Sequence, residues 1–445
     1  MEILIKAIQL ILSLSILVVL HELGHFLPAK YFKTKVEKFY LFFDPWFSLF
    51  KKKVGDTEYG VGWLPLGGYV KIAGMIDESM DKEQMKKPAE PWEFRAKPAW
   101  QRLIIMLGGV VVNLILGVFI YSMTLYTYGD KYLSNSSLSD GLWCVDDLSA
   151  ELGFKTGDKI LLIEGEPVER FSSIVEKMLS AKTITVERDG GSLDIYLPDN
   201  FIEKLIENDK SMLFYPRIPA IVSSFLEESN AEQGGIKIND QIIGVNDVEI
   251  KYNDEMAKTL SSLKDSVVNI LVNREGKEHL LKVKVSQDGT LGYYPAFLTF
   301  NQFEELGVYK MTSQTYNLIN CFPAGLNKAF LKLSGYIDQF KLILNPDSGA
   351  YKGVGGFGAI GSLFPSEWNW ERFWNLTAFL SLMLAFLNIL PIPALDGGHV
   401  TFLLYEMVAG RPASEKFMEY AQVLGMLILL TLVVYANGND IIKLF

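Results

Sequence analysis

The chain has 445 residues, of which 49% are hydrophobic, and a formal net charge of −10. Its mean hydropathy of +0.18 is too high for an ordinary soluble protein and too low for a protein made only of membrane spans, which favours membrane helices joined to water-exposed domains. The negative charge, with no basic stripe, argues against a nucleic-acid partner. Two distant cysteines, Cys144 and Cys321, indicate no disulfide framework and leave open a single bridge in an oxidising compartment.

Four apolar stretches approach the length of about 20 residues that a membrane-spanning helix requires. The first, at 3–27, has no small-x-small cleavage site and is interpreted as a retained span rather than a signal peptide. The others are 103–126, 373–390 and 420–436. Lysine and arginine residues gather in the 28–102 and 391–419 segments. This bias predicts that both segments face the cytoplasm and that the N-terminus and the 129–366 insert face outward.

An H-E-x-x-H sequence, His21-Glu22-Leu23-Gly24-His25, lies near the end of the first span. Residues four apart on a helix project from one face, so His21 and His25 can bind the same metal ion. Glu22 can then accept a proton from water that the metal activates. Ionisable residues in a span are costly and functional by default. The alternative is a chance pentapeptide whose polar side chains simply reach water.

A catalytic zinc site needs a third protein ligand, and Asp396 is the best candidate. It lies in Asn388-Ile389-Leu390-Pro391-Ile392-Pro393-Ala394-Leu395-Asp396-Gly397-Gly398-His399, which follows the third span at the depth expected for the two histidines. Pro391 and Pro393 end the helix and keep the backbone extended before the aspartate. Two alternatives are that Asp396 only caps a helix that starts at Gly397 and that His399 is the third ligand.

The segments between these motifs carry weaker signals. Residues 56–72 predict a β-hairpin or re-entrant β-loop near the metal motif, or else an ordinary cytoplasmic hairpin. Residues 77–95 are charged and predict an exposed connector. The apolar spacing of 308–344 predicts amphipathic helices on the outer membrane surface. The five glycines of 353–361 predict a loop or close backbone packing.

The outward insert contains an internal repeat, because residues 152–165 align with 234–247 at a constant offset. Each copy predicts a turn, a Gly-Asp or Asn-Asp corner, a short strand and a second turn, and helical stretches follow at 171–181 and 253–263. The repeats resemble PDZ domains over about 140–200 and 218–290. That resemblance implies a groove in each for an extended peptide. The alternative is a pair of spacers that bind no peptide.

Together these motifs closely resemble the site-two protease family of intramembrane zinc metalloproteases, bacterial RseP type, over nearly the whole chain. The likeness includes a Gly-x-x-x-Asn from Gly109 to Asn113 and the β-loop sequence Pro65-Leu66-Gly67-Gly68-Tyr69-Val70-Lys71. The Gly353–Gly361 stretch departs from the family, whose members usually have a Gly-Pro segment there. The implied fold is a polytopic α-helical membrane protein with about four transmembrane helices, a membrane-associated β-hairpin and two inserted PDZ-like α+β domains.

The resemblance and the hydropathy pattern predict five parts of the chain. These are an N-terminal membrane part at 1–128, PDZ-like domain 1 at 129–215, PDZ-like domain 2 at 216–295, amphipathic helices and a glycine-rich loop at 296–366, and a C-terminal membrane part at 367–445.

The resemblance also implies the residues of the site. One Zn²⁺ ion is expected on His21, His25 and Asp396, with Glu22 as general base. Substrate contacts are expected from Asn388, Pro391, Pro393, Gly67, Gly68 and Tyr69. Gly109 and Asn113 are expected to pack the second span against the active-site helix.

The function implied by the family is cleavage within the membrane of single-span membrane proteins already shortened by another protease, such as an anti-sigma factor or a remnant signal peptide. The expected location is the lipid bilayer of the bacterial inner membrane, with periplasmic PDZ-like domains and the active site toward the cytoplasm. Two other functions remain open from the sequence. One is a catalytically inactive membrane scaffold that binds peptides through its PDZ-like domains, and the other is a metal transporter.

Overall fold

The computed structural model describes residues 1–75, 88–208, 212–296, 298 and 300–443, so most of the connector predicted at 77–95 lies outside the described residues. The chain divides into two compact units. A helical unit comprises Met1–Gly129, Thr315–Lys341 and Gly353–Phe445, and a β-rich unit comprises Asp130–Gln314 and Leu342–Lys352.

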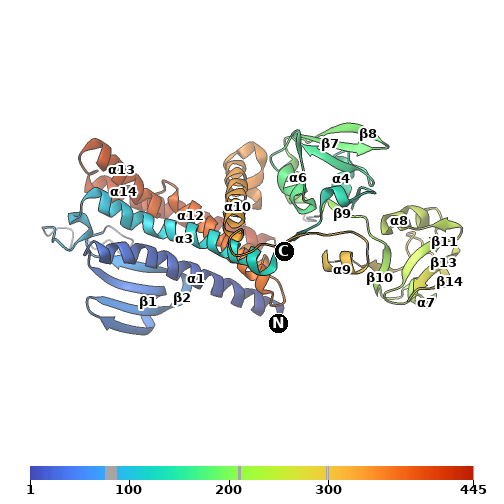
Figure 1. The fold of residues 1–445 in the computed structure, drawn as a ribbon, viewed down its shortest axis with the longest axis horizontal. Helices are drawn as coiled ribbons and strands as arrows, with labels where there is room; N and C mark the ends of the chain where they lie inside the picture. The colour runs from blue at the N-terminus through green and yellow to red at the C-terminus, as the bar shows by residue number, and fades with distance from the viewer. Residues whose placement is uncertain (76–87, 209–211, 297, 299, 444–445) are drawn as a thin grey trace. The chain divides into compact units, whose positions relative to one another are not determined.

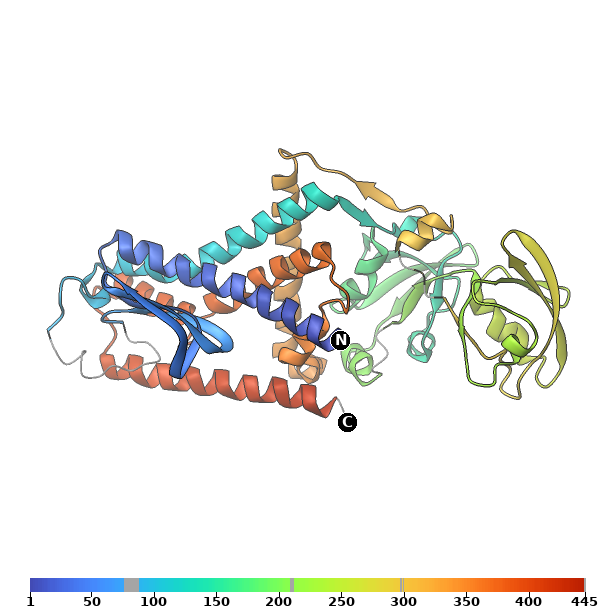
Figure 2. The ribbon, with the colours of Figure 1, turned by 90° about the horizontal axis from the view of Figure 1, so that it is seen from below.

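Within the part of the chain that the structure describes, four helices are long and apolar enough to cross a membrane. They are α1 (Glu2–Tyr31), α3 (Ala99–Tyr128), α12 (Trp370–Ile389) and α14 (Glu415–Ile442), which confirms the four predicted spans. All four continue beyond the apolar stretches at one end or both, because a helix can extend into the interface with polar residues. Both views of the ribbon place the N- and C-termini at the same end of this unit (Figures 1 and 2).

Glycines bring α1 and α3 into backbone contact. A Cβ atom on Gly24 would lie 2.4 Å from Gly108 O, and one on Gly108 would lie 1.9 Å from Gly24 O. A larger residue at either position would push the helices apart, so this contact sets their separation. Buried hydroxyls then join α12 to both: Thr377 Oγ1 donates to Ser13 Oγ at 3.0 Å, and Ser381 Oγ donates to Asn113 O at 2.8 Å.

A long antiparallel hairpin of β1 (Val36–Val54) and β2 (Thr57–Ile72) packs beside α1. A β-hairpin or re-entrant β-loop was predicted within 56–72, whereas this segment is the strand β2, and its partner strand β1 was missed. Repeated register shifts between the two strands break the strict alternation by which a strand is recognised in sequence. The β2 backbone approaches α1 closely, since a Cβ on Gly68 would lie 2.6 Å from Val18 Cγ1.

One sequence expectation for the helical unit needs correction and a second needs refinement. Amphipathic helices were expected across 308–344, but the helix there is α10 (Cys321–Leu344), preceded by β16 (Thr312–Gln314). The glycine-rich 353–361 stretch was expected to be a loop or a place of close backbone packing. It contains the helix α11 (Phe357–Ser362), and it packs closely on α14, since a Cβ on Gly356 would lie 3.0 Å from Asn437 Cα. Side-chain oxygens of α14 accept the first amide hydrogens of α11: Asp440 Oδ2 accepts from Gly356 N at 3.0 Å, and Asn437 Oδ1 from Phe357 N at 3.2 Å. Between α12 and α14 the unit has one more helix among the described residues, α13 (Asp396–Ala409).

The β-rich unit contains two modules, each with its own hydrophobic core. The first has β5 (Lys159–Ile163), β6 (Glu166–Pro167), β7 (Thr183–Arg188) and β8 (Gly191–Tyr196) in the order β6-β5-β7-β8, with β4 (Leu142–Cys144) paired to β9 (Phe214–Pro216), and the helices α4 (Asp147–Glu151), α5 (Ile174–Met178) and α6 (Phe201–Glu207). The short β3 (Asp130–Tyr132) pairs with β16. Cys144 and Cys321 are free thiols.

The second module is built on the same plan. Its sheet has the order β14-β13-β11-β10-β15, with β12 on β11. The strands are β10 (Ala220–Phe225), β11 (Gln241–Val245), β12 (Val248–Glu249), β13 (Val267–Arg274), β14 (Lys277–Lys284) and β15 (Tyr293–Pro295), and the helices are α7 (Asn230–Gln233) and α8 (Asn253–Ser261). Strands β5 and β11 begin 82 residues apart, at Lys159 and Gln241, which confirms the internal repeat.

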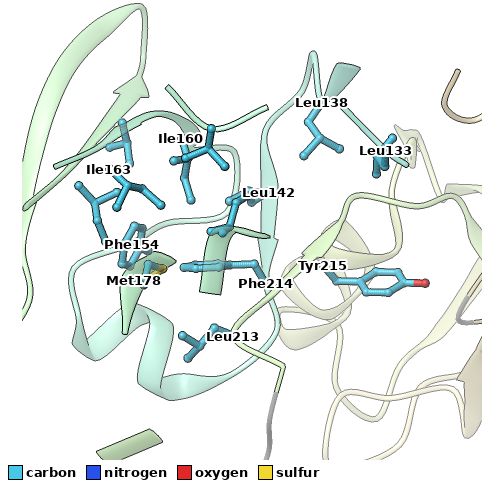
Figure 3. Close-up of a cluster of buried hydrophobic side chains, with 14 of the residues drawn as sticks. Leu133, Leu138, Leu142, Phe154, Ile160, Ile163, Met178, Leu213, Phe214 and Tyr215 are labelled. Carbon is cyan, nitrogen blue, oxygen red and sulfur yellow. The ribbon is translucent and has the colours of Figure 1, made fainter. Parts of the chain in front are cut away.

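The hydrophobic core of the first module also includes residues that follow the second module in the sequence. Leu298, Phe303, Tyr309 and Met311 belong to the hydrophobic core of the first module, and α9 (Phe300–Glu305) carries one of them. Figure 3 shows how β9 serves both sides, because Phe214 points toward Phe154 and Met178 while Tyr215 points the other way. The Tyr215 hydroxyl donates to Leu298 O at 2.8 Å. The 298–311 segment, which follows the second module in the sequence, therefore packs against the first module and completes its hydrophobic core.

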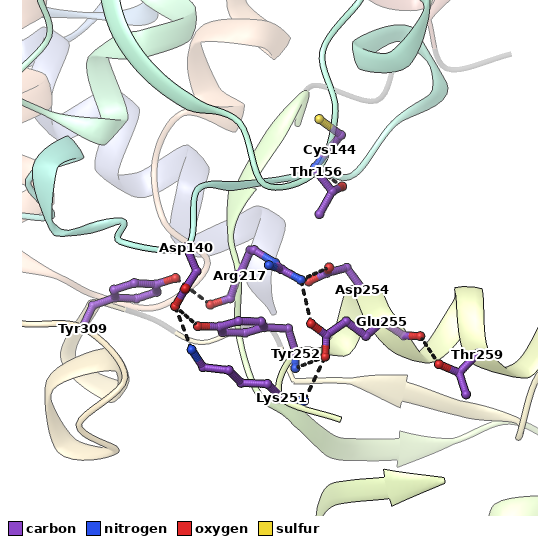
Figure 4. Close-up of polar contacts among 10 residues, drawn as sticks. All are labelled: Asp140, Cys144, Thr156, Arg217, Lys251, Tyr252, Asp254, Glu255, Thr259 and Tyr309. Carbon is purple, nitrogen blue, oxygen red and sulfur yellow. Dashed lines mark hydrogen bonds and ion pairs between the residues drawn. The ribbon is translucent and has the colours of Figure 1, made fainter. Parts of the chain in front are cut away.

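A polar cluster joins the two modules (Figure 4). Asp140 of the first accepts hydrogen bonds from the Tyr252 hydroxyl and, at 2.9 Å, from Lys251 Nζ of the second. Hydrogen bonds from Tyr252 and Lys251 hold the pKa of the Asp140 carboxyl below its usual range. The Arg217 guanidinium stacks 4.2 Å from the centre of the Tyr252 ring and pairs with Asp254. Charged hydrogen bonds of this kind restrain the two modules relative to each other.

Candidate metal centre

Helix α1 presents the two histidines of the H-E-x-x-H sequence from one face, both buried. His25 Nδ1 lies 2.8 Å from Ile105 O on α3. A carbonyl oxygen can only accept, so Nδ1 carries the hydrogen and the Nε2 lone pair of His25 is left free. The two Nε2 atoms lie 3.3 Å apart and face the same space.

Asp396 brings a carboxylate to the same space from the far end of the chain. It is the first residue of α13, not the N-cap of a helix that begins at Gly397, and the short loop after α12 leads into it. Its Oδ2 lies 3.2 Å from His21 Nε2 and 3.3 Å from His25 Nε2. Among the described residues, these three form a group of His, Cys, Asp or Glu side chains close enough to share a metal ion.

The geometry of the three atoms fits zinc. Bonds of 2.0–2.1 Å in a tetrahedral arrangement place ligand atoms about 3.3 Å apart, which matches the three separations of 3.3, 3.2 and 3.3 Å. Asp396 Oδ2 is buried and has no hydrogen-bond partner of acceptable geometry. A buried carboxylate oxygen left without a donor is costly, and a cation at this point would satisfy it.

Asn113 on α3 contacts the other ring nitrogen of His21. Its Nδ2 lies 3.0 Å from His21 Nδ1, while its Oδ1 is buried without a partner. If Nε2 of His21 is the metal-facing atom, Nδ1 carries a hydrogen and needs an acceptor. Turning the amide by 180° exchanges its nearly identical O and N, so that Oδ1 accepts this hydrogen. The Nδ1 hydrogen of His21 then has an acceptor.

Two further predicted residues lie against the histidines. Asn388 Nδ2 is 3.3 Å from His21 Nε2, so this amide reaches the group itself and not only the space for a substrate. Gly109 lies directly beneath the rings, because a Cβ atom there would stand 2.4 Å from His25 Nε2 and 2.6 Å from His21 Cε1. Because Gly109 has no side chain, the two imidazole rings can occupy these positions without a steric clash.

Glu22 connects the motif to the hairpin. Its carboxylate is within electrostatic reach of His21, His25 and Asp396 and accepts a hydrogen bond from the backbone N–H of Val70 on β2. This amide fixes a charge-bearing side chain beside the three candidate ligands. A held carboxylate at this position can accept or return a proton.

Other predicted residues lie elsewhere. The Tyr69 ring stacks on Tyr40, and its hydroxyl donates to Asp44 Oδ1 at 2.8 Å, so its side chain is engaged within the hairpin. Gly67 and Gly68 lie in the same strand, β2. Pro391 and Pro393 lie in the loop before Asp396. His399 lines a separate cavity of about 250 Å³ with Arg95, Arg102 and Glu406, among others.

Known proteins match the chain from end to end. The sequence profile of peptidase family M50 covers residues 9–432. The chain belongs to peptidase family M50. It is 27% identical to the Regulator of sigma E protease of Haemophilus influenzae over 98% of both chains. It is 26% identical to Metalloprotease MmpA of Caulobacter vibrioides over 98% of this chain and 96% of that relative.

Membership of family M50 makes the protein a metalloendopeptidase of the site-two type that uses zinc. This finding sets aside the inactive scaffold and the metal transporter. Together with the four apolar helices, it identifies a membrane protein. The three side chains that fit zinc by distance and donor chemistry come from two helices of this M50 protein, α1 and α13.

Proposed function

We propose that the protein is an intramembrane endopeptidase in which His21, His25 and Asp396 bind one zinc ion and Glu22 is the general base. The observation that carries this proposal is the meeting of three ligand atoms from α1 and α13 at 3.2–3.3 Å from one another. Glu22 lies next to His21 in the same helix. Asp396 is 375 positions from His21 in the sequence (396 − 21), yet the three side chains meet at one point.

Zinc held by these residues supplies a Lewis acid that polarises a carbonyl and acidifies water. The remaining steps belong to the protein. Glu22, held by the Val70 amide, accepts the proton of the attacking water and delivers it to the leaving amide nitrogen. The buried position of the histidines excludes bulk water and strengthens these charge interactions.

The substrate must present an extended backbone, because a helix hides its carbonyls in internal hydrogen bonds. Among the described residues β1 and β2 pair with each other and with no third strand, so a substrate segment can add to the edge of β2 near Gly67 and Gly68. The Asn388 amide lies 3.3 Å from His21 Nε2, and Pro391 and Pro393 lie in the loop between α12 and Asp396. We assign them to substrate binding, with Tyr69 holding the hairpin in shape.

We propose single-span membrane proteins, already shortened by another protease, as the substrates. One relative is named as the Regulator of sigma E protease, and an anti-sigma factor would be a substrate of this kind. The positive residues of 28–102 and 391–419 favour a bacterial inner-membrane location with the active site toward the cytoplasm. The two modules at 129–215 and 216–295 are proposed to be periplasmic PDZ-like domains that bind extended peptide.

The test is cleavage of a model transmembrane substrate by the purified protein, together with its zinc content. Glu22→Gln is expected to retain one zinc and to lose at least 10²-fold in cleavage rate, because an amide cannot accept the proton. Asp396→Asn is expected to lose zinc. His399→Gln is the control and is expected to keep both. Full activity in Glu22→Gln would refute the general-base role, and full zinc in Asp396→Asn would refute the ligand set.

A further inference from the structure

The fourth span, α14, contacts the loop that carries Asp396. Few residues in the apolar part of α14 are buried, yet Gln422 is only 6% exposed. Its Oε1 accepts a hydrogen bond from the backbone N–H of Ala394 at 3.1 Å. A buried amide in an apolar helix is costly unless it is paired, and here its partner is the loop two residues before Asp396.

One turn along the helix, Gly425 brings the α14 backbone against the same loop. A Cβ atom at this position would lie 1.7 Å from Pro393 O and 2.4 Å from the Pro393 carbonyl carbon. Both atoms belong to the backbone and cannot turn away as a flexible side chain can. Any residue other than glycine must therefore separate α14 from the loop. Gln422 and Gly425 therefore hold Pro393 and Ala394 in place, the first by a hydrogen bond and the second by close backbone packing.

The loop needs such a support because its conformation is unusual. Ala394 has φ +81°, in the left-handed region that disfavours every residue with a Cβ atom. Such a conformation persists when the surroundings hold it. The hydrogen bond from the Ala394 amide to Gln422 is one such restraint. The direction in which the chain leaves Ala394 decides where the Asp396 carboxylate points.

The opposite end of α14 is held as well. Asp440 Oδ2 accepts hydrogen bonds from Gly356 N at 3.0 Å and Ala359 N at 3.1 Å, and Asn439 Nδ2 donates to Val354 O at 2.7 Å. The helix is thus tied to its own unit at both ends. A helix fixed in this way can hold a loop in place, whereas a free membrane anchor cannot.

We propose that α14 is part of the active site and that Gln422 and Gly425 are positioning residues, which seat the 391–395 loop so that Asp396 Oδ2 reaches the two imidazoles. The inference rests on the proposed role of Asp396 as a metal ligand. Gln422 does not touch the three ligand atoms itself. It acts through the Ala394 amide on the direction of Asp396.

The experiment compares Gln422→Met and Gln422→Glu in the full-length protein. Met has a similar length without an acceptor, whereas Glu keeps an oxygen for the Ala394 amide in either protonation state. We expect Gln422→Met to bind zinc 10–100-fold more weakly in chelator competition and to shift the visible absorption bands of the cobalt-loaded protein. Gln422→Glu is expected to stay within about threefold of the parent in zinc affinity.

Gly425→Ala gives a second, independent variant in case Gln422→Met does not fold. It is expected to lower zinc affinity at least tenfold, whereas Gly438→Ala on the same helix, where a Cβ would meet no atom within 4 Å, is expected to change nothing. Parent-like zinc affinity and cobalt bands in Gln422→Met and Gly425→Ala would overturn the proposal. Equal losses in Gln422→Met and Gln422→Glu would do the same, since that pattern reports packing alone. Asp396→Asn, measured in parallel, tests the ligand role separately.

Discussion

At the scale of single residues, the hydrogen bonds behind the two histidines decide which ring nitrogen faces the metal. Ile105 O accepts a hydrogen bond from His25 Nδ1. The Asn113 amide lies 3.0 Å from His21 Nδ1. Partners of this kind fix the tautomer and orientation of a ligating imidazole and raise its basicity. The sequence predicted Asn113 only as a packing residue in the second span. Its second use depends on α3 lying against α1.

We predict that Asn113→Leu binds zinc 10–100-fold more weakly than the parent, because the His21 Nδ1 hydrogen loses its acceptor. Asn113→Asp keeps an acceptor oxygen and is expected to retain most of the affinity. Zinc dissociation constants measured by competition with a chelator in detergent provide the readout. Thr124→Val is the matched control on α3, since the Thr124 hydroxyl donates to Tyr121 O of the same helix. An unchanged constant in Asn113→Leu would show that the amide does not orient the ring.

At the scale of elements, the two modules repeat one corner in detail. Asp158 pairs with Arg188 at 2.7 Å and accepts from Lys155 N, and Asp240 pairs with Arg274 at 2.6 Å and accepts from Lys237 N. Both aspartates are 1% exposed. The Gly-Asp and Asn-Asp corners seen in the sequence therefore carry buried charge pairs. Each pair ties the turn before the central strand to the end of the strand beside it.

We predict that Asp240→Asn destabilises the second module, because it leaves the Arg274 guanidinium without its charged partner. Burial opposes ionisation of Asp240, but Arg274 and the Lys237 amide outweigh it and hold its pKa below the usual range. This stabilisation is present above the unfolded pKa of about 3.9 and is lost as pH falls through the lower folded value. The difference in stability between the parent and Asp240→Asn should therefore begin to narrow as pH falls below about 4.

Hydrogen exchange of β11 and β13 in the full-length protein measures this difference. The control is Asp247→Asn, which changes an exposed aspartate of the next turn and should leave exchange unaltered. A gap between parent and Asp240→Asn that stayed constant from pH 7 to pH 3.5 would contradict the charge-pair explanation.

Elements with a local signal were predictable from the sequence. Hydropathy located α1, α3, α12 and α14, and the repeated corners located β5 and β11. Strand β1 was missed because bulges and Pro45 disturb its alternation. The return of 298–311 to the first module was also missed, since a contact between distant segments leaves no periodic pattern in either.

The site divides in the same way. His21, His25 and Asp396 were found because each stands in a compact motif of chemistry-bearing residues. The contacts of Ile105 with His25, of Val70 with Glu22 and of Gln422 with the loop before Asp396 come from helices and a strand whose sequences show only ordinary membrane or hairpin patterns. Two of these contacts are made by the backbone atoms of Ile105 and Val70, and such contacts cannot be inferred from residue type. The ligands are thus readable from the sequence, whereas most of the residues that orient them are not.

At the scale of the whole molecule, the four spans and the charge distribution together define an orientation. Both termini lie at one end of the helical unit (Figure 2). An even number of spans requires them to share one side of the membrane, and the lysine- and arginine-rich 28–102 and 391–419 segments then share the other. The proposed orientation, in which the insert between α3 and α12 is on the side of the termini, follows from this count and stays a prediction. The positive-inside bias assigns the two sides.

We predict that a cysteine at Glu90 is labelled only from the cytoplasm and one at Ser192 only from outside. Both positions are exposed in the structure, and Cys144 and Cys321 would first be replaced by serine, so that each variant has a single thiol. In intact cells, a membrane-impermeant maleimide should modify Ser192→Cys at once and Glu90→Cys only after the inner membrane is permeabilised. The reverse pattern would place the H-E-x-x-H end of α1 toward the outside and refute the proposed orientation. Labelling of both in intact cells would mean that the membrane was not sealed, which a cytoplasmic marker protein measured in the same sample detects.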